Sequence, residues 1–255
     1  MKIDRRRHYV LVVDTETANT QIVDGQLDST NTLVYDCGWA VVDTKGNIYE
    51  TSSYVNTDVF FDGLMASAYY VKKIPQYLED IGKGRRVLAD TMTIRREMLA
   101  VMKKYEIKEV AAHNARFDYN SLNATLRAVT KSRYRYWFPF GTIFWDTMRM
   151  STDVICKMPT YIKWCKEHKG CMLKNGKPRK TAEILYQFIM KDADFRERHT
   201  GLEDVLIEYQ IMMYCYRQKK KMRKRLFDED IYTPTDFQVA LSVNLKKFPT
   251  VRMGT

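Results

Sequence analysis

The 255-residue chain carries 42 basic and 31 acidic residues, a formal net charge of +11, and it is 45% hydrophobic and 13% aromatic. This composition excludes a globally disordered chain, and the length fits one sizeable domain. The positive charge favours a polyanionic partner, of which nucleic acid is the commonest, although a basic protein without such a partner would have the same composition.

Five cysteines without a Cys-x-x-Cys pair predict free thiols in a reducing compartment. Residues 1–8 are charged and lack the apolar region of a signal peptide, and no stretch approaches the ~18 apolar residues of a membrane span. We therefore expect a cytoplasmic protein, or a nuclear one in a host cell with a nucleus, and no membrane association.

The first structured segment combines a strand with two acids. Residues 10–13 are Val-Leu-Val-Val, which predicts a buried strand, and Asp14 and Glu16 follow at its end. The two-residue period of a strand puts both carboxylates on one side, where like charges repel and burial is costly. A divalent metal ion between them is the simplest compensation.

The next segments predict an antiparallel three-strand meander. Residues 18–32 are polar and predict a loop, residues 33–42 and 47–55 predict strands, and residues 43–46 form the tight turn between them.

A helical pattern over residues 64–82, interrupted at Pro75, precedes a parallel addition to this sheet. Residues 93–105 predict an amphipathic helix and residues 109–112 a short apolar strand. A strand, a helix and a strand in this order indicate a parallel crossover.

A second polar stretch follows that strand. The strand is expected to end near His113, which we interpret as a structural residue, and a helix is expected over residues 117–129. Asp118 then lies in the first helical turn, where the positive end of the helix dipole stabilises an anion. An aspartate at a helix start is also common without any function.

Residues 131–138 are basic and aromatic, a composition that suits single-stranded nucleic acid but equally a core with solvated cations. Residues 142–145 predict a strand, closed by Asp146. Cys156, Cys165, His168 and Cys171 could be taken for a zinc site, but their spacing matches no common zinc pattern and buried thiols explain them.

The third polar stretch opens a late helix. Thr200 and Glu203 have capping-box spacing, so a helix is expected to run from here to about residue 217, with Asp204 one turn inside it and His199 just before it. Residues 219–225 then hold six cations in seven positions. They indicate a solvated helix end, a contact for nucleic acid or a localisation signal.

The grouped acids suggest a common site. Strand ends and helix starts on one edge of an open α/β sheet form the binding crevice. Four carboxylates there suit a pair of Mg²⁺ or Mn²⁺ ions, which promote phosphoryl displacement. A neighbouring histidine can take a proton from the attacking water near neutral pH.

These three stretches resemble the Exo I, Exo II and Exo III motifs of the DEDDh-type 3′→5′ exonucleases, the superfamily of the proofreading ε subunits and RNase T. The matching residues are Asp14 and Glu16 of the first motif, Asn114, Phe117 and Asp118 of the second, and His199 and Asp204 of the third. The Trp145-Asp146-Thr147 segment also resembles a strand end that follows Exo II in many members. A departure is Ala18-Asn19, where many relatives have Thr-Gly.

The resemblance implies an α/β, RNase H-like mixed sheet, an antiparallel three-strand meander plus two parallel strands, flanked by helices. It assigns residues 1–218 to the exonuclease domain and residues 219–255 to a basic segment and C-terminal extension. It implies that the four acids hold two Mg²⁺ (or Mn²⁺) and that His199 is the general base. The residues expected to contact substrate are Thr15, Thr17, Asn114 and Phe117.

The implied reaction is hydrolysis of the terminal phosphodiester bond of nucleic acid at a single-stranded 3′ end, releasing nucleoside 5′-monophosphates, with DNA slightly favoured. An RNA-trimming exoribonuclease and a non-catalytic nucleic-acid-binding module are the alternatives. Because no polymerase domain is recognised, a proofreading role would need a polymerase or other replication partner in trans.

Overall fold

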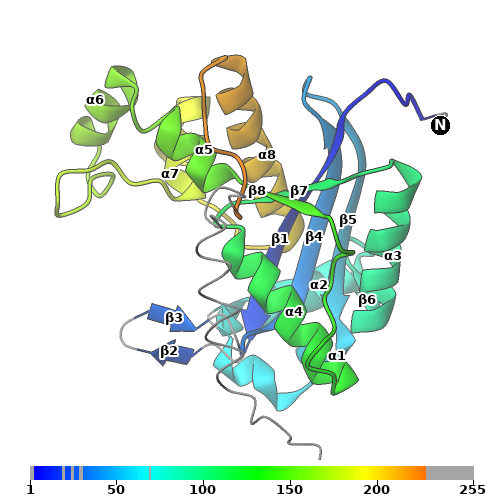
Figure 1. The fold of residues 1–255 in the computed structure, drawn as a ribbon. Helices are drawn as coiled ribbons and strands as arrows, with labels where there is room; N and C mark the ends of the chain where they lie inside the picture. The colour runs from blue at the N-terminus through cyan, green and yellow to red at the C-terminus, as the bar shows by residue number, and fades with distance from the viewer. Residues whose placement is uncertain (1–2, 19–20, 24–25, 29–30, 69, 228–255) are drawn as a thin grey trace, which may run out of the picture.

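A six-stranded mixed sheet forms the centre of the computed structural model, which describes residues 3–18, 21–23, 26–28, 31–68 and 70–227 (Figure 1). The strand order is β6-β5-β4-β1-β7-β8. The strands are β1 (Tyr9–Ala18), β4 (Leu33–Asp43), β5 (Ile48–Asn56), β6 (Val87–Ala89), β7 (Glu109–Ala112) and β8 (Ile143–Asp146).

The predicted sheet is confirmed. β1, β4 and β5 form the antiparallel meander, and β7 and β8 add to β1 in parallel. The sequence did not predict β6, which pairs in parallel with β5 at the edge of the sheet. Three residues are too few to establish a strand periodicity.

Three local predictions need correction. β1 runs on through both acids to Ala18, because β4 pairs with it along its whole length, with a register shift between Glu16 and Thr17. The expected loop over residues 18–32 contains the hairpin of β2 (Gln21–Val23) and β3 (Gln26–Asp28). The expected helix over residues 64–82 is divided into three elements: η1 (Gly63–Ser67), η2 (Val71–Lys73) and α2 (Ile74–Gly82).

Pro75 explains where α2 begins. It lies in the first turn of α2, where its missing amide hydrogen costs no helical hydrogen bond. The proline therefore begins a helix, whereas the sequence pattern suggested an interruption.

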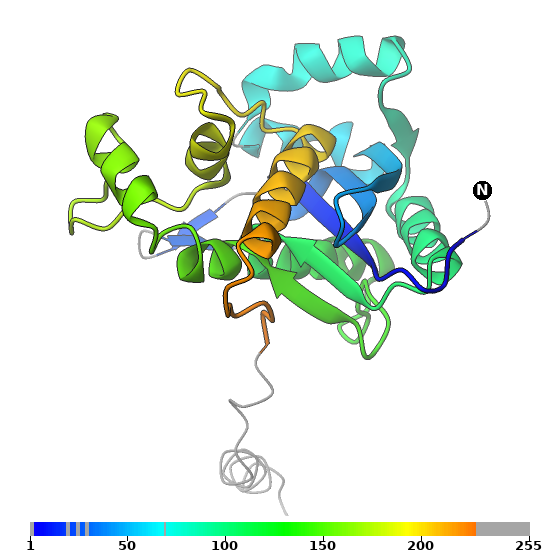
Figure 2. The same ribbon diagram turned by 90° about the horizontal axis from the view of Figure 1, so that it is seen from above.

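Helices cover both faces of the sheet (Figures 1 and 2). α3 (Thr91–Lys104) and α4 (Arg116–Thr130) pack through Met98 and Leu122 against one face. The other face packs against α5 (Thr147–Asp153), α7 (Ala182–Met190) and α8 (Gly201–Arg217). The remaining helices are α1 (Thr57–Phe60) and α6 (Pro159–Glu167), and α6 stands away from the sheet in Figure 2.

The alternation along β1 decides which face receives the acids. Leu11 and Val13 belong to the core under α3 and α4, whereas Val10 and Val12 belong to the core under α8. Asp14 and Glu16 continue the second series, so they project towards α8.

The basic run after α8 is not simply a solvated helix end. Lys219 to Lys221 are exposed, but the following residues return to the sheet. The carbonyl of Lys224 accepts a hydrogen bond from the Asp146 amide at 2.7 Å, and the Leu226 amide donates to Phe144 at 2.8 Å. Leu226 is buried in the core, which anchors this segment beside β8. The rest of the predicted extension, residues 228–255, lies outside the described residues.

The five cysteines are free, as predicted. Within the described ranges, no helix is both long and apolar enough to cross a membrane.

Candidate active site

The four acids of the three sequence motifs come together at the junction of β1, α4 and α8. Asp14 and Glu16 project from β1, Asp118 lies in the first turn of α4, and Asp204 lies in the first turn of α8. Burial raises the pKa of Asp14 well above its usual range, and repulsion from Asp204, Asp118 and Glu16 raises it further. The fold therefore concentrates negative charge at one point.

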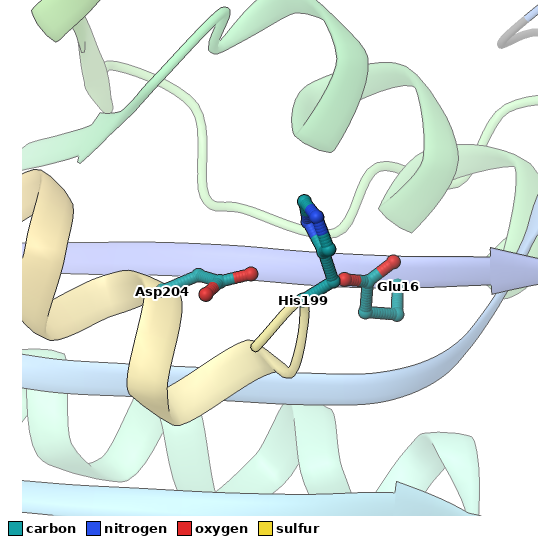
Figure 3. A group of neighbouring side chains, drawn as sticks. All are labelled: Glu16, His199 and Asp204. Carbon is teal, nitrogen blue, oxygen red and sulfur yellow. The ribbon is translucent and has the colours of Figure 1, made fainter. Parts of the chain in front are cut away.

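Glu16, His199 and Asp204 form the tightest part of this group. One side-chain ligand atom from each lies within 4.8 Å of the others. Figure 3 shows the carboxylate of Asp204 turned towards His199 and Glu16, with the histidine on the loop that enters α8. Among the described residues, these three make the one group of His, Cys, Asp and Glu side chains close enough to share a metal ion.

Two glycines let α8 approach the sheet closely enough to place Asp204. A Cβ on Gly201 would lie 2.6 Å from the amide nitrogen of Gly38 on β4, closer than side-chain carbons approach a backbone. The Gly201 amide donates to the buried carboxylate of Asp36 at 2.9 Å. The start of α8 is thus bonded directly to β4.

The predicted capping box has different hydrogen bonds. The helix begins at Gly201 as expected, but the Thr200 hydroxyl donates to the carboxylate of Glu203 at 2.6 Å and makes no capping bond to the helix backbone. The Thr200 amide donates to Asp204 at 3.1 Å. This bond orients one oxygen of Asp204, and the other, Oδ1, has no hydrogen-bond partner among the residues that the structure describes.

Asp118 is held by β1. The Thr15 hydroxyl donates to Asp118 Oδ1 at 2.8 Å, and burial raises the pKa of Asp118 to about 7 against the opposing effect of this bond. Thr15 and Thr17 are both buried. The Thr15 side chain stands on the opposite side of β1 from Asp14 and Glu16, and the register shift between Glu16 and Thr17 interrupts this alternation before Thr17.

The rest of the second motif forms the turn into α4. Asn114 is exposed and has a φ of 67°, and its amide donates to Asp146 at 3.2 Å. Phe117 is half-buried. His113 has both ring nitrogens hydrogen-bonded, Nδ1 to the Thr147 hydroxyl at 2.9 Å and Nε2 to the Lys180 carbonyl at 2.7 Å. These bonds support the structural interpretation of His113.

Sequence reasoning missed a fifth acid, Glu208. It is 2% exposed and lies on α8 one turn after Asp204. Of the acids that raise the pKa of Asp14, Glu208 has the largest effect. The sequence does contain a signal for Glu208: it is a glutamate within the largely apolar segment 205–213, and it follows the expected metal ligand Asp204 by four residues, which is one helical turn.

Two residues of the segment before α2 were also missed. The Tyr70 ring stacks on the His199 imidazole, with 4.5 Å between centroids and 13° between planes. Lys73 Nζ donates to the backbone carbonyls of Arg198 and His199. Nothing in the sequence connects these residues with a histidine more than 120 positions away, because the contact depends on the tertiary fold.

His199 is held in a form suited to accepting a proton. Partial burial lowers its pKa, and the positive charge of Lys73 lowers it further, while Glu183 opposes both. The imidazole is therefore neutral at pH 7. Its Nδ1 lies 3.6 Å from Glu197 Oε2.

The donor set fits hard divalent cations. Asp14 Oδ2, Asp204 Oδ1 and Glu208 Oε2 are buried carboxylate oxygens without a hydrogen-bond partner among the described residues. Burying such carboxylate oxygens costs free energy unless they bind a cation, and Mg²⁺ and Mn²⁺ prefer carboxylate oxygens as ligands.

The other sequence candidates lie elsewhere. Within the described part of the chain, the cysteines near His168 do not form a metal-binding group, and His168 Nδ1 bonds the Trp164 carbonyl at 2.8 Å. In the basic-aromatic run over residues 131–138, Trp137 is buried, as expected for a core residue. Tyr134 is exposed, as expected for a residue that could contact single-stranded nucleic acid. That run follows the end of α4, roughly 18 Å along the helix from Asp118.

Comparisons with known proteins support the fold. No protein-family model matches the sequence, and no curated protein is similar to it in sequence. Among solved structures, one similar fold is the nuclease domain of 3′hExo, a DEDDh family member, bound to rAMP. It has a TM-score of 0.53 and 12% identity, with 87% of this chain and 98% of that chain covered.

Two further structures are a full-length 3′-exonuclease and a 3′-exonuclease that recognises the 3′ end of a histone mRNA stem-loop. Their TM-scores are 0.54 and 0.55, each at 12% identity and covering 86% of this chain and 85% of that chain. The chain therefore has the fold of the DEDDh-type 3′→5′ exonucleases.

Proposed function

We propose that this protein is a metal-dependent 3′→5′ exonuclease. In this proposal, the domain over residues 1–218 hydrolyses the terminal phosphodiester bond of nucleic acid and releases nucleoside 5′-monophosphates. Residues 219–255 form an extension. The observation that carries the proposal is the convergence of buried carboxylate oxygens, which have no hydrogen-bond partner in the described part of the chain, beside a neutral histidine, on a fold shared with DEDDh exonucleases.

Asp14, Glu16, Asp118 and Asp204 would hold two Mg²⁺ or Mn²⁺ ions. Such ions lower the pKa of bound water and stabilise negative charge on phosphate oxygens. Thr15 contributes by fixing one oxygen of Asp118 through its hydroxyl. The Thr200 amide does the same for Asp204.

His199 acts as the general base in this proposal. Its neutral imidazole accepts a proton from the attacking water, which is the role for which a lowered pKa is suited. The Tyr70 ring limits the imidazole to one plane, and Lys73 holds the backbone carbonyl of His199 at 3.4 Å. These contacts reduce the number of orientations that the base can adopt.

The terminal nucleotide is proposed to lie against four residues around the acids. Asn114 and Phe117 offer accessible surface at the start of α4. Thr15 and Thr17 are buried on the strand that carries Asp14 and Glu16, so in this proposal they border the nucleotide through the strand backbone. A single-stranded 3′ end is the substrate that such a site accepts most directly.

DNA and RNA remain two candidate substrates. The sequence interpretation slightly favoured DNA, whereas two of the similar structures concern rAMP and a histone mRNA stem-loop, which favours an exoribonuclease as the second candidate. A polymerase or other replication partner in trans belongs to the DNA version of the proposal.

One degradation assay tests the proposal. Single-stranded DNA, duplex DNA and RNA, each labelled at the 5′ end, are incubated with purified protein and Mg²⁺, Mn²⁺ or EDTA. We expect a ladder of products shortened from the 3′ end, release of nucleoside 5′-monophosphates, and no turnover in EDTA.

Asp14→Asn and Asp204→Asn should each abolish the ladder while the protein stays folded by circular dichroism. Asp194→Asn, which changes an exposed aspartate, is the matched control and should retain wild-type activity. If Asp14→Asn degraded the oligonucleotides at the wild-type rate, the proposed site would be wrong. Nucleic-acid binding without any metal-dependent turnover would instead identify a non-catalytic binding module.

A further inference from the structure

Glu208 is a buried acid that the four-acid motif does not include. It lies on α8 four residues after Asp204, so one helical turn places both side chains on the same face. Only 2% of the residue is exposed. Its charge raises the pKa of Asp14 on β1, and the charge of Asp118 on α4 raises the pKa of Glu208.

The hydrogen bonds of Glu208 leave half of its carboxylate unsatisfied. The backbone amide of His113 donates to it, which accounts for one oxygen. Oε2 is buried and has no hydrogen-bond partner in the described ranges. If the group were a neutral acid serving only to fill space, its proton would require an acceptor, and Oε2 contacts none.

The surrounding charges do not compensate Glu208 either. Lys73 lowers the pKa of Asp204, but the charged groups that dominate the environment of Glu208 are the acids Asp118, Asp204 and Glu197. A buried carboxylate among other carboxylates is strongly unfavourable unless a cation is bound nearby. Oε2 of Glu208 and Oδ2 of Asp14 are buried oxygens without a hydrogen-bond partner among the described residues, and a cation bound by the four acids would offset the charge of both.

We propose that Glu208 is a fifth carboxylate of the metal centre, whose buried negative charge strengthens the binding of divalent cations by the four acids. This inference rests on the proposed function, because it assumes that the four acids bind metal. It adds that the metal affinity of this protein depends on a residue outside the four-acid set.

Calorimetric titration of the metal-free protein with Mn²⁺ tests this role without measuring activity. Glu208→Gln keeps the size and the hydrogen-bonding capacity of the side chain and removes its charge. We expect Mn²⁺ affinity to fall by about 10–100-fold, the range seen when groups supporting a metal site are changed. Glu167→Gln removes an exposed acid on α6 and should leave the affinity unchanged.

Thermal unfolding supplies the second readout. Glu208→Gln removes one of several buried charges that repel one another, so the thermal unfolding midpoint of the metal-free variant should be higher than that of the metal-free wild type. Saturating Mn²⁺ should then raise the midpoint of the variant by less than it raises that of the wild type. Glu208→Met, which removes the charge with an apolar side chain of similar length, should behave in the same way and provides the measurement if the glutamine variant does not fold.

Equal Mn²⁺ affinity in the wild type and either Glu208 variant would overturn the inference, and Glu208 would then be a neutral structural acid. If the wild type itself bound no Mn²⁺ or Mg²⁺, the proposed function would fail together with this inference. The wild-type titration therefore distinguishes the two failures.

Discussion

Arg86 is the charged residue whose removal should most disturb the support of the site. Its guanidinium is 2% exposed and donates to Asp36 at 3.1 Å, to Asp80 at 3.2 Å and to Glu203 at 3.0 Å. Asp36 is fully buried and also accepts the amide of Gly201, the first residue of α8. The ion-pair network thus connects β4 with the helix that carries Asp204.

Replacing Arg86 by Met leaves Asp36 buried without its cation. Burial already raises the pKa of Asp36, and Arg86 is the strongest group that opposes this shift. Removing one partner of a buried ion pair costs about 3–5 kcal/mol. That is a large part of the 5–15 kcal/mol or so that stabilises a typical domain. We therefore expect Arg86→Met to lower the free energy of unfolding by about 3–5 kcal/mol, measured by urea denaturation.

Arg85 supplies a matched control in the neighbouring position. Its side chain is 52% exposed and pairs with the exposed Glu79 and with the buried Asp80, which keeps Arg86 as a second partner, so Arg85→Met should cost about 1 kcal/mol, less than Arg86→Met. Adding Asp36→Asn to the Arg86→Met variant should recover part of the loss, since the uncompensated charge disappears. If both arginine variants had equal unfolding free energies, the network would not stabilise the fold and this reasoning would be refuted.

Three other changes test the site. Burial raises the pKa of Asp118 to about 7 and that of Asp204 to about 8, so both groups bind protons more tightly in the folded state. The contribution of these two groups to the stability of the metal-free protein is then fully present below the unfolded pKa near 4 and is lost as the pH rises to about 8. In thermal unfolding with EDTA, the midpoint of the wild type should therefore fall more between about pH 6 and about pH 8 than that of an Asp118→Asn, Asp204→Asn double variant, and equal slopes would contradict this. Gly201→Ala places a methyl group against the backbone of β4 and should cost about 1–3 kcal/mol or more in chemical denaturation. Lys73→Met removes a cation that lowers the pKa of His199, so the acidic limb of the pH–rate profile should move to higher pH, whereas an unmoved limb would exclude this coupling.

The three-strand meander, the two added parallel strands and the location of the three acidic motifs were accessible from the sequence, because each depends on local pattern. The apolar run before Asp14 predicts β1, and the alternation over residues 47–55 predicts β5. The helix starts near Asp118 and Asp204 were also predicted within one or two residues. Hydrophobic periodicity and turn residues carry this information without reference to distant parts of the chain.

The segments that were predicted wrongly depend on pairing between distant elements. β6 is three residues long and is a strand because β5 offers it an edge. The segment around Leu226 lies beside β8 because its side chain fills the core, although its composition is that of a solvated basic run. Local composition does not record such long-range contacts.

The sequence by itself determined the chemistry of the site, since the residue types and the strands and helices that carry them suffice to predict a carboxylate site with a histidine. Only the tertiary structure decided what surrounds these residues. It buries Glu208 among the acids, stacks Tyr70 on His199, and bonds Asp36 to Arg86 across 50 positions of the chain. The physical reason is that burial and charge compensation are properties of the packed interior, which forms only when β4, α2 and α8 meet.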